Sequence, residues 1–287
     1  MTRAEAVELA GRVATGYRLA PPGRIVRGPA GVYAGAAAGQ SIDFHDHREY
    51  HPGDDLRRVD WRAYARGAAL QLKLFREEIA PIVEIVLDAS GSMGAYAGKE
   101  EAAVFIAALV AGAARAVEGR PVLLAGHARW SGPAVEAGLL TVVFAGGANR
   151  PEPSEGGIHT HAARVVIGDF LFEEGVAACF ARYAAGTPAF EPVRLRSRSE
   201  RDPSDWLGGH RFLDAEEENR RLDLVVTPAV VAAYRRRLER HEESLAIEAA
   251  RYGGRLHLLD VPDDALDPDA CDGLADALIR VGLLVPA

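Results

Sequence analysis

An acid and two serines at alternate positions follow a short apolar strand. Val83–Leu87 (VEIVL) is typical of a buried strand, and Asp88, Ser90 and Ser92 come directly after it. Ligands of open α/β sheets bind beyond the carboxyl ends of the strands, which is where these side chains fall. Their oxygens suit a hard cation such as Mg²⁺, which takes few protein ligands and keeps several waters. The alternative is that Asp88 and Ser90 only satisfy the backbone of the turn.

A second aspartate, Asp169, closes another apolar strand, which is predicted at residues 164–168 (RVVIG). If the two strands are neighbours, both carboxylates face one crevice together with Ser90 and Ser92. Two like charges in such a place repel each other unless a cation or a proton lies between them. The two strand ends together therefore favour a divalent metal site over a simple turn.

The sequence lacks two common enzymatic motifs and only partly fits a third. Gly98 and Lys99 are followed by Glu100, and position 93 is not glycine, so the phosphate loop of ATP-binding proteins is absent. No G-x-S-x-G elbow occurs, which argues against a serine hydrolase. A metal-dependent phosphohydrolase of the haloacid-dehalogenase type, with Asp88 as nucleophile, is the enzymatic alternative. Ser90 counts against it, because the general acid of such enzymes should be an aspartate at that position.

The segments around these residues alternate between strands and helices. Residues 98–117 predict a helix that is apolar around most of its surface and therefore heavily buried. Further strands are predicted at 121–126, 139–144, 190–196 and 255–260, further helices at 172–184, 228–251 and 269–280, and a polar excursion at 197–226 with a hairpin around 211–214 and 222–226. This alternation predicts an α/β fold over residues 81–287, with a mainly parallel sheet and helices on both faces.

Residues 1–80 are predicted to form an N-terminal appendage, helical at 3–17 and then extended or β-rich, with a strand at 70–75. Its polar cluster includes Asp55, the predicted cap of a short helix. Acids and arginines mixed this closely predict an ion-pair network anchored by Trp61. A docking surface is the functional alternative, because Arg and Trp are frequent at binding hot spots. A zinc site at His45 and His47 is weakly indicated, because H-x-H on an extended segment supplies only two ligands.

The composition is that of an ordinary globular protein: 287 residues, 48% hydrophobic and 26% charged, with a net charge of −8. The negative charge argues against general nucleic-acid binding. No apolar run is long enough to span a membrane, and the first residues do not have the pattern of a signal peptide. Cys179 and Cys271 fit small buried hydrophobes in a reducing compartment. We therefore expect a cytoplasmic protein without a membrane or nucleic-acid partner.

These residues resemble two known patterns. The sequence D-A-S-G-S-M after a first strand resembles the metal-ion-dependent adhesion site of von Willebrand factor A domains. The polar cluster resembles the signature of the bacterial family catalogued as domain of unknown function 58, and the similarity is best over residues 40–175. The positions that carry it are Tyr50, Gly53, Asp54, Asp55, Arg57, Arg58, Asp60, Trp61, Arg62, Ala65, Arg66, Leu72, Lys73, Glu77, Glu78, Gly168, Asp169 and Phe170.

The resemblance implies a Rossmann-like von Willebrand factor A fold and a non-enzymatic role. In that role, an acidic residue of a partner protein completes the coordination of a bound metal. The metal ligands it implies are Asp88, Ser90, Ser92 and Asp169, and Mg²⁺, Mn²⁺ and Ca²⁺ all accept oxygen ligands of this kind. Such sites normally add a threonine from a Gly-Gly-x-Thr-like loop that opens a helix. Thr160 is the nearby candidate, but the three residues between it and the strand at 164 leave no room for that helix.

The resemblance also implies a partner. Members of this family are commonly linked to MoxR-type AAA+ ATPases and are thought to act with them in chaperone-like assembly or maturation of other proteins. A MoxR-type ATPase is therefore the expected partner of this chain. A scaffold whose metal site is vestigial is the remaining alternative.

Overall fold

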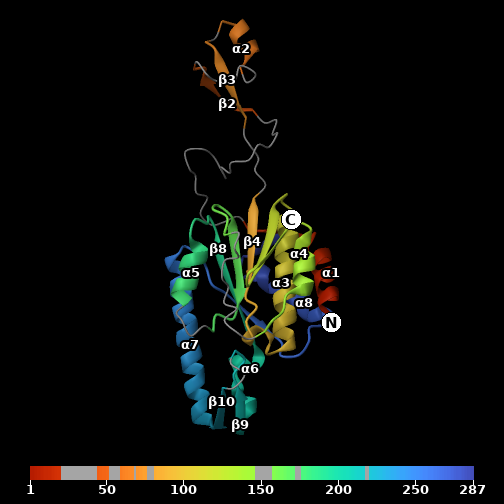
Figure 1. Cartoon of the computed structure of the whole chain (residues 1–287), viewed down its shortest axis with the longest axis vertical. Coiled ribbons are helices and arrows are strands. Elements are labelled where there is room, and N and C mark those ends of the chain that lie inside the picture. The colour runs from red at the N-terminus through yellow and green to blue at the C-terminus, as the bar shows by residue number, and fades with distance from the viewer. Residues whose placement is uncertain are drawn as a thin grey trace. The chain divides into compact units, whose positions relative to one another are not determined.

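A computed structural model describes residues 1–20, 44–51, 59–67, 69–75, 81–145, 157–171, 176–216 and 220–287 (Figure 1). The chain divides into two compact units. The larger unit consists of residues 1–26 and 81–287, and the smaller unit consists of residues 27–80. The strand-end residues singled out by the sequence all belong to the larger unit.

A six-stranded sheet forms the centre of the larger unit, with the strand order β11-β8-β7-β4-β5-β6. All neighbouring pairs are parallel except β5 and β6, which are antiparallel. The strands are β4 (Ile82–Leu87), β5 (Arg120–Ala125), β6 (Ala128–Ser131), β7 (Ala163–Gly168), β8 (Phe190–Ser197) and β11 (His257–Val261). This mixed α/β architecture is compatible with a Rossmann-like fold and confirms the predicted fold class at that level.

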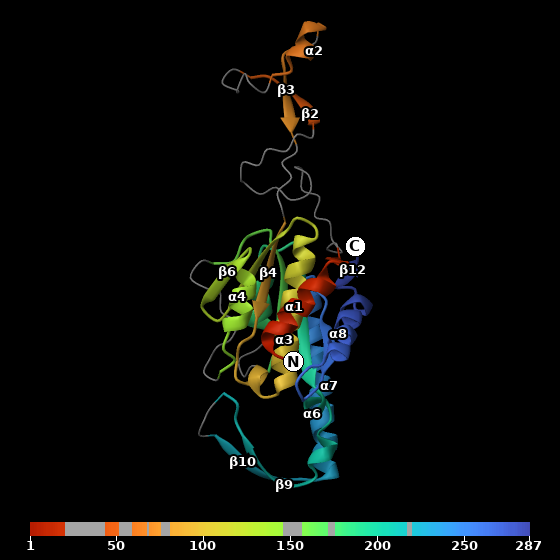
Figure 2. The ribbon, with the colours of Figure 1, turned by 90° about the vertical axis from the view of Figure 1, so that its right-hand side faces the viewer.

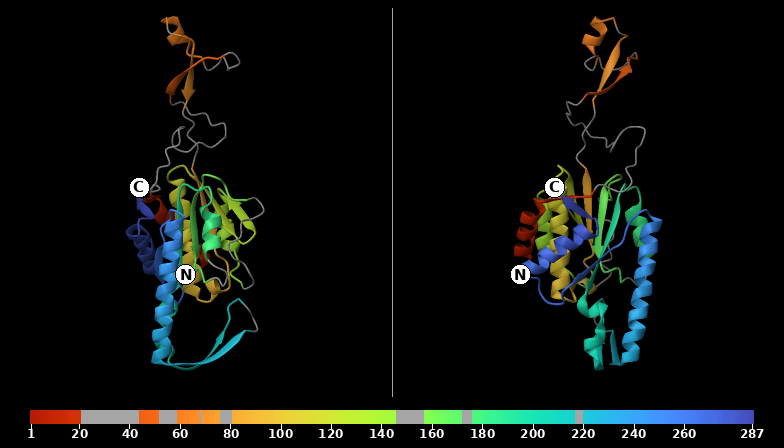
Figure 3. Two further views of the ribbon diagram at one scale, coloured as in Figure 1. Left: turned by 90° about the vertical axis from the view of Figure 1, so that its left-hand side faces the viewer. Right: turned by 180° about the vertical axis from the view of Figure 1, so that it is seen from behind.

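Helices cover both faces of this sheet (Figures 1 and 3). The helices on one face are α1 (Arg3–Ala14), α3 (Ala97–Arg115), α4 (Ala134–Thr141) and α8 (Pro268–Arg280), and those on the other face are α5 (Val176–Ala184) and α7 (Pro228–Arg251). Successive side chains of β4 point to opposite faces of the sheet. Ile85 and Leu87 belong to the core under α3, and Val86 belongs to the core under α5 and α7. The predicted helix at 98–117 is α3, and it is the most deeply buried one, with other helices against its outer surface.

The first helix belongs to the sheet unit and not to the appendage at 1–80 in which the sequence analysis placed it. Helix α1 packs along α3. It does so through a stripe of Ala6, Ala10 and Ala14, all buried and spaced four residues apart. Small side chains allow close approach, and at one end a Cβ on Gly112 would be 2.4 Å from the Ala14 Cβ. The two helices are therefore closely packed through small side chains.

The strand predicted at residues 139–144 is not present. Residues up to Thr141 belong to α4, and the sheet ends instead in β6. A short apolar run such as LLTVVF does not distinguish a strand from a buried helix. Packing decides between them here, because Val135 and Leu139 are buried under α3, and Gly138 lies against the Trp130 ring of β6.

The smaller unit contains an antiparallel pair of strands, β2 (Phe44–Glu49) and β3 (Gln71–Phe75), and one short helix, α2 (Trp61–Ala65). The cap of α2 is Asp60, whose carboxylate accepts the N–H groups of Arg62 and Ala63. Asp55, the predicted cap, lies outside the described residues, as do the side chains of His45 and His47 in β2.

The polar excursion follows β8. It contains the short helix α6 (Arg198–Arg201), a 3₁₀ turn at Pro203–Trp206, and the strands β9 (Gly208–Leu213) and β10 (Arg221–Val226). β9 and β10 pair with each other as the predicted hairpin and with no other described strand. Figure 2 shows this hairpin beyond the same edge of the sheet as α6. A further ribbon joins β1 (Tyr17–Leu19) to β12 (Leu284–Pro286).

Candidate functional site

Asp88 lies at the carboxyl end of β4, next to the end of β7. β4 is bordered by β5 on one side and by β7 on the other, so its end is a topological switch point, where α/β proteins bind ligands. The Asp88 N–H donates to the Ile167 carbonyl at 2.8 Å and so extends the β4–β7 ladder by one residue. The strands that carry the two predicted aspartates are therefore neighbours, as the sequence analysis required.

The two oxygens of the Asp88 carboxylate have different surroundings. Oδ1 accepts the Ser90 N–H at 3.0 Å. This bond stabilises the turn backbone, as expected if Asp88 has a structural role. Oδ2 is buried and has no hydrogen-bond partner among the described residues. The hydroxyls of Ser90 and Ser92 are 3.1 Å apart and bond to each other. The structure thus brings Asp88, Ser90 and Ser92 together at one turn, with one carboxylate oxygen unused.

The residues Gly168, Asp169 and Phe170 have three different roles at the end of β7. Gly168 leaves space for the Asp88 side chain, because a Cβ there would lie 2.8 Å from the Asp88 Cβ. Asp169 is buried, and its Oδ1 accepts the Leu171 N–H at 3.1 Å. Phe170 has a φ of 53°, a strained value for a bulky residue, and its buried ring packs edge-on against Phe180 at 5.2 Å. The strained backbone is held by this packing, so the position of Asp169 is fixed.

The Lys99 side chain fills the space beside Asp169. It comes from the first turn of α3 and is completely buried. Its Nζ donates to Asp169 Oδ2 at 2.7 Å, to Glu200 Oε1 at 2.6 Å and to the Ser92 carbonyl at 3.2 Å. An ammonium group has three donors, and all three are used. Lys99 therefore ties the β4 turn and the β7 end to a third part of the chain.

That third part is the excursion after β8, which brings two more acids to this edge of the sheet. Glu200 of α6 bonds Lys99 through one oxygen and the Ser197 N–H through the other, in a capping box. Glu216, from the connection between β9 and β10, accepts the N–H of Gly91 at 3.1 Å and of Ser92 at 2.8 Å, one with each oxygen. The hairpin thus contacts the D-x-S-x-S turn directly.

Lys99, Glu200 and Glu216 were not among the residues that the sequence analysis selected. Two of them have a detectable signal. Ser197 and Glu200 form an S-x-x-E pattern directly after a predicted strand, so the acid had to lie at the carboxyl edge. Lys99 stands in the first turn of a helix, where the helix dipole disfavours a cation. Glu216 has no comparable signal, because it is one of several acids in a polar segment.

The protonation of the two central groups follows from this arrangement. Burial, followed by the charge of Asp169, raises the pKa of Asp88 from 3.8 to about 7, although hydrogen bonds from Ser90 act in the opposite direction. Burial alone would lower the pKa of Lys99, but the charges of Asp169 and Glu200 and the hydrogen bonds to both raise it above its ordinary value. Lys99 is therefore a cation at neutral pH, and Asp88 titrates in that range.

The residues at this edge do not fit a divalent ion shared by Asp88 and Asp169. The unused Asp88 Oδ2 would suit a metal, but both oxygens of Asp169 are already taken, one by the Lys99 ammonium and the other by the Leu171 N–H. Thr160 cannot contribute, because it precedes β7 and packs near Gly186 at the opposite, amino edge of the sheet. Among the described residues, no group of three or more His, Cys, Asp and Glu side chains is arranged to hold a metal ion. The metal role of the other predicted ligands stays a prediction.

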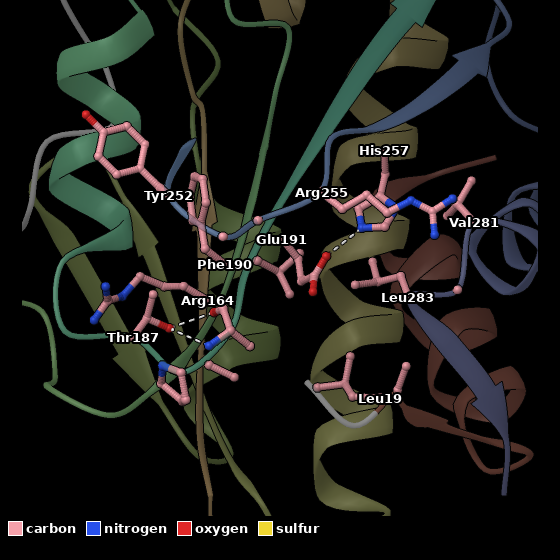
Figure 4. A pocket seen from close by; sticks show the side chains of 18 of the residues that line it. Leu19, Arg164, Thr187, Phe190, Glu191, Tyr252, Arg255, His257, Val281 and Leu283 are labelled. Atoms are coloured by element: carbon pink, nitrogen blue, oxygen red, sulfur yellow. Dashed lines mark hydrogen bonds and ion pairs between the residues drawn. The ribbon is translucent and has the colours of Figure 1, made fainter. Parts of the chain in front are cut away.

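A cavity of about 730 Å³ lies at the amino edge, lined by parts of β7, β8 and β11 (Figure 4). Two of its polar side chains bond to their own surroundings: Glu191 Oε2 is 2.7 Å from His257 Nε2, and the Thr187 hydroxyl lies 2.6 Å from the carbonyl oxygens of both Ala162 and Ala189. None of the predicted metal or catalytic aspartates lies there. The carboxyl edge is therefore the candidate site.

The fold and this edge define an α/β protein with a mostly parallel sheet and a cluster of acids around one lysine at its switch point. Residues 46–130 match the family model described as "Protein of unknown function DUF58", which confirms the resemblance to that family. The matched region extends from β2 of the smaller unit through the D-x-S-x-S turn and α3 to β6. No curated protein and no solved structure matches the chain. None of the described helices is long and apolar enough to cross a lipid bilayer.

Proposed function

We propose that this chain is a non-enzymatic protein-interaction module that docks an acidic residue of a partner at the D-x-S-x-S turn. One observation carries the proposal: the carboxylate of Glu216 is bound across the N–H groups of Gly91 and Ser92. Main-chain donors that hold one carboxylate through both oxygens suit another carboxylate equally well. In this proposal, Glu216 occupies the docking position until a partner replaces it.

The surroundings of the turn support exchange of this kind. Glu216 is exposed, and its hairpin has no described strand partner outside itself. The hairpin also exposes apolar side chains, with Leu213 at 69% and Val225 at 64% exposure. By contrast, the turn is anchored from beneath by the buried side chains of Asp88 and Lys99. A turn held by buried side chains beside a hairpin that belongs to no larger sheet is the arrangement that replacement of Glu216 requires.

The proposed partner is a MoxR-type AAA+ ATPase, with which the chain would act in the assembly or maturation of other proteins in the cytoplasm. The support for this partner is the resemblance to the family, now joined by the match over residues 46–130. A von Willebrand factor A type of fold, within the Rossmann-like class, is part of the same proposal. No hydrolytic step is included, because Ser90 occupies the position where a phosphohydrolase of the type considered above needs a carboxylic acid.

Binding to the purified MoxR-type ATPase of the same organism tests the proposal. Glu216→Gln removes the charge of the competing side chain, and Glu243→Gln makes the same change at an exposed residue of α7. Loss of a charge-assisted contact worth roughly 1.5 kcal/mol should tighten partner binding by about tenfold in Glu216→Gln. Glu243→Gln should bind like the unchanged protein. Absence of binding, or equal affinities for both variants, would overturn the docking proposal.

A further inference from the structure

The contacts of Lys99 are those of a counter-ion inside the protein, and differ from those of a surface ion pair. The exposed fractions of the Lys99 and Asp169 side chains are 0% and 1%, and that of Glu200 is 17%. A buried carboxylate stays ionised at little cost only when it is paired and hydrogen-bonded. One ammonium group satisfies acids from β7 and from α6, together with a carbonyl of the β4 turn.

The place of this lysine in its helix is unfavourable by itself. Lys99 lies in the first turn of α3, where the helix dipole stabilises anions and destabilises cations. Its long side chain also loses rotamer freedom on burial. A residue placed against its local preference points to a compensating interaction. Here that interaction is the pair of acids, since no other described group contacts Nζ besides the Ser92 carbonyl.

We propose that Lys99 is the resident cation of this site, bound between Asp169 and Glu200, so that Asp169 is committed to the ammonium and the carboxyl edge is held together without a metal. Mg²⁺ demands near-octahedral oxygens at about 2.1 Å. The oxygens around Nζ lie at hydrogen-bond distances, and Asp169 has one oxygen on Lys99 and the other on the Leu171 N–H. A second cation beside the ammonium would also be repelled by it.

Thermal unfolding of the full chain with EDTA or with an excess of MgCl₂, MnCl₂ or CaCl₂ tests the inference directly. The expected result is the same Tm under all four conditions. A rise in Tm that disappears in Asp88→Asn or Asp169→Asn would place a metal at this edge and overturn the proposal. A rise that persists in both variants comes from binding elsewhere and agrees with it. This measurement uses the unchanged protein, so it stands even if variants of Lys99 fail to fold.

A second test removes the charge of Lys99. Lys99→Met keeps an unbranched side chain, one atom shorter, but leaves two acids without a counter-ion, so its Tm should fall by roughly 10 °C. Arg237→Met, which removes a cation from an exposed position of α7, is the control. Adding Asp169→Asn to Lys99→Met should restore part of the lost Tm, because it removes one of the uncompensated charges. If the double variant is less stable than Lys99→Met alone, Lys99 acts by packing and the counter-ion role is wrong.

Discussion

The side chain of Asp88 lies directly over Gly168 of the neighbouring strand. A Cβ on Gly168 would be 2.8 Å from the Asp88 Cβ and 2.9 Å from its Oδ2. Real Cβ atoms do not approach other atoms this closely, so any other residue at position 168 must displace the Asp88 carboxylate or its strand. The glycine before Asp169 therefore sets the spacing between the two strand ends.

We expect Gly168→Ala to lower the free energy of unfolding by roughly 1–3 kcal/mol, the usual cost of overpacking a buried position. The matched control is Gly11→Ala in α1, where nothing lies within 4 Å of the added Cβ. That change should stabilise the helix by about 0.5–1 kcal/mol. Urea denaturation of both variants measures the difference. If Gly168→Ala is as stable as the unchanged protein, the Asp88 side chain moves aside at little cost.

Stability should depend on pH through Asp88. In the folded protein this carboxyl keeps its proton up to about pH 7, because burial and Asp169 raise its pKa, whereas the unfolded chain releases it near 3.8. Between these values the folded state binds more protons than the unfolded state, so the contribution of Asp88 to the free energy of unfolding falls as the pH rises. It is fully present below about pH 4 and is lost at about pH 7 and above.

Asp88→Asn removes this titration and is the comparison that isolates it. The difference in unfolding free energy between the unchanged protein and Asp88→Asn should shift against the unchanged protein as the pH rises from about 4 to about 7. Urea denaturation at several pH values in this window measures it. Parallel curves for the two proteins would show that Asp88 ionises in the folded state as it does in the unfolded chain.

The elements that the sequence predicts well are those with a clear local pattern. Helices α3, α7 and α8 and the strands β4, β7 and β8 appear close to their predicted bounds, because each has a clear apolar period or run. The run at 139–144 fails because an apolar run of this length fits a buried helix as well as a strand. The assignment of residues 3–14 to the appendage fails because only packing on α3 shows where that helix belongs.

The candidate site likewise contains residues that the sequence predicts and residues that it does not. Asp88, Ser90, Ser92 and Asp169 can be selected because each lies just after a recognisable strand. The groups that complete the site are joined only by the fold: Lys99 and Asp169 are 70 residues apart in sequence, and Glu216 is 125 residues from Gly91. A sequence pattern predicts which side chains reach the edge of a sheet. It does not show which distant cation or acid meets them there.

Both cysteines should be poor nucleophiles in the folded protein. Burial, followed by the charge of Asp88, raises the pKa of Cys179 to about 12, and burial with neighbouring acids raises that of Cys271 to about 11. The thiolate is the reactive form, so little of it is present at neutral pH. Iodoacetamide should therefore modify the native protein far more slowly than the urea-unfolded chain, as followed by mass spectrometry. Fast native labelling of Cys179 would mean that its surroundings are open to solvent.

A second buried ion pair lies inside the sheet, away from the candidate site. Glu84 of β4 and Arg164 of β7 are both 0% exposed and are joined at 2.7 Å, and the other Glu84 oxygen accepts the His159 N–H at 2.9 Å. Glu84→Gln leaves the Arg164 charge buried without its partner and should lower the free energy of unfolding by about 3–5 kcal/mol. Glu8→Gln, which breaks the solvent-exposed pair with Arg12, should change it little. Urea denaturation measures the free energy of unfolding of both variants. A loss in Glu84→Gln as small as that in Glu8→Gln would mean that water or another acid reaches Arg164.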